Sequence, residues 1–156
     1  MTSKLDSLEM KQIMTVLGSY YALKNALVAT DGNAAAAASK QLIADATEAS
    51  GHLQATGSVH YAEMRPYLDT IIVQSKLISA ETDKRCEKQR IAFSPLSDAL
   101  VNMLKTADLK NAGVYKQYCP MAFNDKGAYW LSDVNEIKNP YFGKKMLECG
   151  EVTDSL

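Results

Sequence analysis

The sequence lacks the features that define several large functional classes. Its 17 Lys and Arg residues nearly balance 18 Asp and Glu, and a net charge of −1 provides no positive field to attract nucleic acid or an anionic membrane. No apolar run approaches the roughly 20 residues of a membrane span. The motifs of serine hydrolases, P-loop proteins and zinc peptidases are also absent. We therefore expect a protein without nucleic-acid binding, a membrane span or enzymatic activity.

The sequence also gives little information about the cellular compartment. Residues Met1 to Asp6 lack the apolar core of a signal peptide, so the sequence read alone would place the protein in the cytosol. The three cysteines do not decide the matter, because an odd number leaves at least one thiol free even if the other two pair.

What the chain does contain is an ordinary globular composition, with 47% apolar and 22% charged residues. A length of 156 residues suits one domain with a single core. We predict one domain over residues 1–156, with a helical bundle at about 7–110 and an aromatic cap at about 113–152.

Four segments have the apolar spacing of amphipathic helices. Their limits are Met10–Val28, Ala34–Leu53, Met64–Ile78 and about Thr82 to Lys105. Helices of roughly 20 residues joined by short loops predict an antiparallel four-helix bundle.

Three residues bear on the details of the third and fourth predicted helices. Pro66 either kinks the third helix or lies in its first turn, which would leave residues 60–64 in a preceding turn. Pro95 either kinks the fourth helix or begins a new one after Ser94. Cys86 falls on the inward stripe of the fourth helix, where we expect a small buried residue.

The character of the chain changes after Gly113. The β-prone runs 114–118 and 128–131 flank a turn at 124–127 and predict a hairpin, followed by an irregular Asn-Pro turn and a short helical piece ending at Gly150. Seven of the 12 aromatic residues lie between Tyr115 and Phe142, which favours a cap that docks on the bundle. The predicted fold class is mainly α, an antiparallel four-helix bundle with a small C-terminal β-hairpin/loop cap.

Two cysteines in this cap each lie close to a methionine. Cys119 and Met121 would share one face of an extended segment, and Met146 and Cys149 would share one face of a helical turn. Thiolate and thioether are soft ligands, which select Cu(I) over hard cations, whereas zinc prefers Cys, His and carboxylates. Both residue types are also common in protein cores, so a structural role stays open.

His60 and Met64 form a second possible pair, of nitrogen and sulfur, if the third helix begins early enough to place them one turn apart. A histidine near a helix start is more often solvated or capping. A disulfide between Cys119 and Cys149 is the main alternative to a metal site, because closing a loop of about 30 residues stabilises by about 3–4 kcal/mol in the chain-entropy model.

Four motifs occur in order between Tyr118 and Gly150: Tyr-Cys-Pro-Met-Ala, Gly-Ala-Tyr-Trp-Leu-Ser, Glu-Ile-Lys-Asn-Pro-Tyr-Phe-Gly and Lys-Met-Leu-Glu-Cys-Gly. They resemble the signature of a domain of unknown function in bacterial envelope proteins. That domain occurs alone after a signal peptide, and at the C-terminal end of some heavy-metal efflux membrane-fusion proteins. The resemblance extends to residues 60–64 and 89–97, and it makes His60 a candidate ligand.

The resemblance implies a periplasmic or envelope-associated protein that handles copper or silver, with metal-efflux components as partners. We therefore predict a module that binds Cu(I) or Ag(I) for sequestration or transfer in heavy-metal resistance. Its candidate ligands are Cys119, Met121, Met146, Cys149, His60 and Met64. The alternative is a structural or protein-interaction domain without metal, in which Cys119 and Cys149 form a disulfide or stay as buried thiols.

Overall fold

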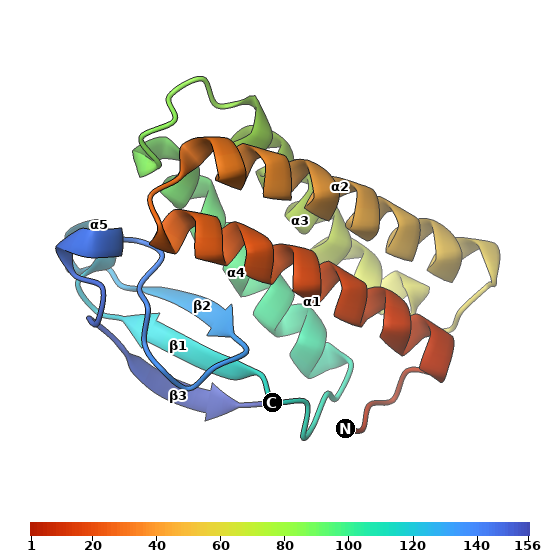
Figure 1. Ribbon diagram of the computed structural model, residues 1–156. Helices are drawn as coiled ribbons and strands as arrows, with labels where there is room; N and C mark the ends of the chain where they lie inside the picture. The colour runs from red at the N-terminus through yellow and green to blue at the C-terminus, as the bar shows by residue number, and fades with distance from the viewer.

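The bundle predicted from the apolar spacing is confirmed by the computed structural model, which describes all residues 1–156 (Figure 1). Its helices are α1 (Ser7–Val28), α2 (Gly32–Ala55), α3 (Tyr61–Ala80) and α4 (Glu87–Thr106). Each packs against the next in the chain, and successive helices run in opposite directions. No helix combines the length and the apolarity that a bilayer crossing requires.

Side chains that precede the first two helices fix where they begin. Asp6 caps α1 by accepting from the Glu9 N–H at 2.8 Å, and the Glu9 carboxylate accepts from the Asp6 N–H at 3.0 Å. This reciprocal pair satisfies two main-chain donors that a helix start leaves free. Asp31 caps α2 with a single bond, because its carboxylate accepts from the Ala34 N–H at 3.0 Å.

The two proline ambiguities are resolved in favour of continuous helices. Pro66 lies inside α3, and the Met64 N–H already donates to the His60 carbonyl at 3.1 Å, so the interpretation that put Pro66 in the first turn is wrong. Likewise α4 continues through Pro95 without a new start.

Cys86 is buried as predicted, but it does not lie on the stripe of a helix. Residues 81–86 form a loop, and α4 begins only at Glu87, about five residues later than predicted. Asp83 organises this loop, because its carboxylate accepts from the main chain and the guanidinium of Arg85. Cys86 follows as the N-cap, with a left-handed φ of 76°.

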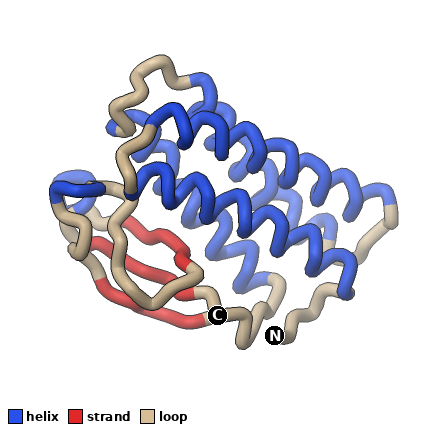
Figure 2. The backbone as a smooth tube through the Cα atoms, in the orientation of Figure 1, coloured by secondary structure: helices blue, strands red, loops and turns tan.

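The cap contains the predicted hairpin and one strand more. Strands β1 (Tyr115–Cys119) and β2 (Ala128–Ser132) are antiparallel, with Cys119 opposite Ala128. The additional strand β3 (Glu151–Ser155) pairs with the other edge of β1, which gives the order β2-β1-β3. Figure 2 shows this sheet on one side of the bundle. All five residues of β3 are exposed, so no alternation of apolar and polar residues marks it in the sequence.

The predicted helical piece ending at Gly150 is wrong. A short 3₁₀ turn, η1 (Gly143–Lys145), ends at Met146, whose φ of −149° and ψ of 55° are not helical. The Cys149 N–H then donates to the Met146 carbonyl at 3.1 Å, which closes a separate turn.

Aromatic residues join the cap to the bundle, and 36 buried residues of both parts form one contiguous core. The Tyr20 hydroxyl of α1 accepts from the Leu131 N–H of β2 at 3.0 Å, and its ring stacks on Phe93 at 5.1 Å between centroids. Burial raises the pKa of Tyr20 well above its ordinary value. The Tyr141 ring lies 5.6 Å from Phe93 and 6.0 Å from Trp130.

Candidate metal site

The sulfurs of Cys119 and Cys149 lie 3.4 Å apart, in contact but not bonded. Cys119 is the last residue of β1 and is fully buried, whereas Cys149 is half-buried in the turn before β3. A disulfide would place the sulfurs about 2.05 Å apart. Two sulfurs that share a tetrahedral metal at about 2.3 Å lie about 3.8 Å from each other. The pair is therefore close to the spacing that either a bond or a shared ion requires.

Asn139 holds Cys149 in this place. Its side chain is fully buried, and its amide nitrogen donates to the Cys149 carbonyl at 2.7 Å. Its amide oxygen accepts from the N–H groups of Tyr141 and Phe142 at 2.8 and 3.2 Å. One side chain thus fixes both the Asn-Pro turn and the second cysteine. The sequence signals only the turn, so this role of Asn139 was not predicted.

Gly150 allows the chain beside Cys149 to approach the middle of the cap. It has a φ of +146°, and a Cβ at this position would lie 2.9 Å both from the Trp130 ring and from the Tyr118 carbonyl oxygen. Only glycine accepts this conformation together with so close a contact. Gly150 is therefore a packing residue, and not the end of a short helical piece as predicted.

Both predicted methionines of the cap lie beside the cysteine pair, but in different ways. The main-chain N–H of Met121 lowers the pKa of the Cys149 thiol, while the Met121 side chain is 47% exposed. Met146 and Cys149 line one shallow hollow on the surface, together with Leu147 and Glu148. Solvent therefore reaches the cysteine pair from the side of Cys149, where Met146 borders the same hollow.

The hydrogen bond between the two thiols affects their ionisation. It raises the pKa of Cys149 above its ordinary value, and partial burial adds to this effect, while the Met121 N–H opposes it. A soft ion that binds the pair as thiolates must displace the thiol protons.

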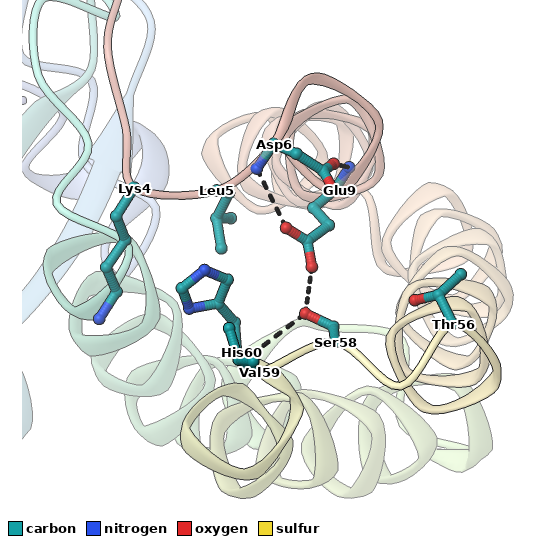
Figure 3. A pocket seen from close by; sticks show the side chains of 8 residues that line it. All are labelled: Lys4, Leu5, Asp6, Glu9, Thr56, Ser58, Val59 and His60. Atoms are coloured by element: carbon teal, nitrogen blue, oxygen red, sulfur yellow. Dashed lines mark hydrogen bonds between the residues drawn. The ribbon is translucent and has the colours of Figure 1, made fainter.

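His60 lies elsewhere, in a hollow at the start of α1 (Figure 3). The lining residues are Lys4, Leu5, Asp6, Glu9, Thr56, Ser58, Val59 and His60. His60 Nδ1 is 2.9 Å from Glu63 Oε1, which also pairs with Lys4 Nζ at 2.9 Å. Glu9 accepts from the Ser58 hydroxyl, so its carboxylate ties the loop between α2 and α3 to the start of α1.

The six predicted ligands therefore do not form one site. His60 lies where α1 begins, while the cap segment that holds Cys149 lies where α1 ends, since a Cβ on Gly143 would touch Thr30 and Val28. The 22 residues of α1 span about 33 Å, which separates the two ends (Figure 1). Met64 is fully buried in the bundle core, as a helical apolar position requires.

The structure gathers few potential metal ligands in one place. No group of three or more His, Cys, Asp or Glu side chains gathers anywhere in the structure. A structural zinc site takes four such ligands, and calcium takes six to eight oxygens. The potential soft donors that lie in contact are the two thiols, and Met146 borders the same hollow as Cys149.

A family model described as "Protein of unknown function (DUF3347)" matches residues 16–112. This range covers most of the bundle, including His60 and Met64, and ends before β1. Cys119 and Cys149 lie outside it. No curated protein and no solved structure matches the chain.

Proposed function

The chain belongs to the DUF3347 family of proteins of unknown function, and we propose that it is a Cu(I)- or Ag(I)-binding module of the bacterial envelope. The observation that carries the proposal is the contact of the Cys119 and Cys149 sulfurs at 3.4 Å. These two residues bind the ion as thiolates. The protein holds the ion or hands it on, without turnover.

The chemistry of the donors favours a soft monovalent ion. Cu(I) and Ag(I) are stable with two or three sulfur ligands, and two thiolates more than neutralise their single charge. Met146 borders the same hollow as Cys149 and supplies a third donor, a thioether. Met121 contributes its main-chain N–H, which stabilises a thiolate on Cys149. His60 is left out of this site because it lies beside Asp6 and Glu9 at the start of α1, and Met64 because it is buried in the bundle core in the first turn of α3.

The proposed envelope location and partners have a different basis. They follow from the resemblance of the motifs between Tyr118 and Gly150 to a domain of bacterial envelope proteins. We propose that metal-efflux components receive or deliver the ion, in sequestration or transfer during heavy-metal resistance. A half-exposed Cys149 suits such a transfer, since a donor's sulfur can approach the ion from that side.

The direct test is anaerobic competition of the reduced protein against a chromogenic Cu(I) chelator, with Zn(II) titrated in parallel. We expect one Cu(I) per chain, retained against the chelator, and much weaker retention of Zn(II). Failure to compete at any protein-to-chelator ratio, or tighter retention of Zn(II), would contradict the assignment.

The same contact supports a second candidate, a structural or protein-interaction domain in which the thiols close as a disulfide. The bond would tie β1 to the chain that precedes β3 and so fix the cap. In that case the oxidised protein should resist urea better than the reduced protein by about 3–4 kcal/mol, and the reduced protein should not retain Cu(I).

A further inference from the structure

We propose that Cys119 and Cys149 also form a reversible dithiol–disulfide couple, in which Cys149 reacts first with an external disulfide and Cys119 then closes the internal bond. The inference concerns the same residues as the proposed function, but it needs no metal. It follows from three features of the pair: unequal exposure, contact of the sulfurs, and unequal support from the surrounding chain.

The exposure of the two thiols sets the order of reaction. Cys149 lines the surface hollow beside Met146, whereas Cys119 has no exposed surface. An external disulfide must meet a thiolate along the S–S axis, so only an accessible sulfur can start the exchange. Cys149 is therefore the residue that attacks, and Cys119 is the residue that resolves.

The contact of the sulfurs makes the second step fast. The 3.4 Å separation has only to shorten by about 1.4 Å to reach the disulfide length. Cys119 sits in β1, which is paired with β2 on one side and β3 on the other. Cys149 lies outside any helix or strand, in the turn after η1 whose main chain Asn139 holds, so closure of the bond moves the Cys149 side chain and leaves the strand in place.

The chemistry balances with a low-molecular-weight disulfide as the oxidant. The Cys149 thiolate attacks one sulfur of the external disulfide, whose S–S bond breaks and releases one thiolate. The Cys119 thiolate then attacks Cys149 Sγ, and the mixed disulfide breaks and releases the second thiolate. The two protons of the protein thiols end on the two released thiols. The protein thiols lose two electrons in forming their disulfide, and these electrons reduce the external disulfide.

The oxidation state of Cys119 and Cys149 would control metal binding. Sulfurs joined in a disulfide no longer act as thiolates, so oxidation removes both proposed ligands together and releases the ion. Cys86 does not compete as a partner, because it is fully buried at the N-cap of α4 and contacts neither of the two sulfurs.

The experiment treats the reduced, metal-free protein with oxidised glutathione, stops the reaction with acid and measures the intact mass. The variants are Cys119→Ser and Cys149→Ser, with Cys86→Ser as the matched control. Peptide mapping of the wild-type product identifies the bonded cysteines independently of whether each variant folds. Addition of reduced glutathione to the product tests reversal.

The wild type and Cys86→Ser should lose two hydrogens and keep no glutathione. Cys119→Ser should stop at a stable adduct of one glutathione on Cys149, and Cys149→Ser should react at least about tenfold more slowly than the wild type. The proposal is overturned if Cys149→Ser reacts as fast as the wild type, if Cys119→Ser forms no adduct, if mapping finds Cys86 in the bond, or if reduced glutathione does not restore the thiols. Because no metal is present, a failure here differs from a failure of the Cu(I) competition.

Discussion

The bundle and the cap are held together by different kinds of interaction. In the bundle, repeated apolar positions such as Leu17, Leu42, Leu68 and Leu100 are buried to 1% exposure or less. Each contributes to a continuous core, and no single one determines the arrangement. In the cap, single residues decide the path of the chain: Asn139 through its hydrogen bonds and Gly150 through its close contact. The paired thiols lie in this second region.

The backbone shows the same contrast. The interior of the four long helices contains no residue with a left-handed φ, whereas Phe123, Asn124 and Asp125 adopt it in succession in the short segment α5 (Ala122–Asp125). Each such residue costs about 1–2 kcal/mol, which the rest of the molecule must offset. The difference teaches that the stable bundle acts as a platform for an irregular cap, a common arrangement for functional sites.

The largest expected effect is the loss of the cap itself. Truncation after Lys110 exposes Tyr20 and Phe93, both fully buried against the cap. We expect a destabilisation of at least about 5 kcal/mol, or loss of cooperative unfolding, in urea denaturation followed by circular dichroism. Removal of 151–156 alone, which deletes the exposed β3, should cost clearly less. Equal midpoints for the truncated and full-length proteins would show that the bundle does not need the cap.

The next effect concerns Arg90, a residue of α4 that contacts the cap. Its guanidinium donates to the Pro140 carbonyl and to the Leu27 carbonyl, each at 2.7 Å. We expect Arg90→Ala to lower the free energy of unfolding by about 2–3 kcal/mol, because one charged hydrogen bond from α4 to the cap and one from α4 to the end of α1 are lost. Arg85→Ala is the matched control, since the Arg85 side chain is 83% exposed and should change stability by less than about 1 kcal/mol. Similar losses of stability in the two variants would show that Arg90 is not a specific link between the bundle and the cap.

Gly150→Ala tests the cap from within. The added methyl would overlap the Trp130 ring and the Tyr118 carbonyl, so we expect a loss of about 1–3 kcal/mol and slower closure of the internal disulfide. Gly57 also has a positive φ, of 63°, but no atom lies within 4 Å of the added methyl. Gly57→Ala should therefore show backbone strain alone, about 1 kcal/mol, with an unchanged rate of closure. Normal closure in Gly150→Ala would contradict the packing role.

The smallest effect has the opposite sign. Lys24 of α1 is 3% exposed, and its ammonium donates to the Ser132 hydroxyl of β2 at 3.4 Å and lies 5.9 Å from the centre of the Tyr21 ring, but has no carboxylate partner. Burial lowers the pKa of Lys24, so the unfolded chain binds this proton more tightly. Stability should therefore rise as the pH increases towards the ordinary lysine range. Lys24→Met should stabilise the protein by about 1 kcal/mol at neutral pH and flatten this rise. A destabilised variant would mean that the charge has a stronger partner.

The contrast between bundle and cap also explains what the sequence could predict. The four helices were predicted because buried positions repeat at the helical period, as with Met64, Leu68 and Ile71 on α3. The start of α4 was missed because Asp83 stabilises a loop through contacts with Arg85, which have no periodic signal. Strand β3 was missed because all five of its residues are exposed and therefore show no alternation of apolar and polar residues.

For the candidate site, the sequence paired the two cysteines of the cap but could not show which other candidate ligands lie near them. The prediction that Cys119 and Cys149 belong together agrees with the contact of their sulfurs. His60 could not be separated from them by residue type, because the fold alone places it at the opposite end of α1. The parts played by Asn139 and Gly150 depend on contacts across the cap, which no local pattern records.

The central claim is that the cysteine pair of the cap, and not the bundle, binds a soft metal ion. It is tested most directly by anaerobic Cu(I) competition on reduced Cys119→Ser beside reduced Cys86→Ser, with circular dichroism to show that both variants are folded. We expect Cys119→Ser to lose tight Cu(I) binding, by at least about a hundredfold, while Cys86→Ser binds as the wild type does. Retained affinity in Cys119→Ser, or its loss in Cys86→Ser alone, would contradict the account.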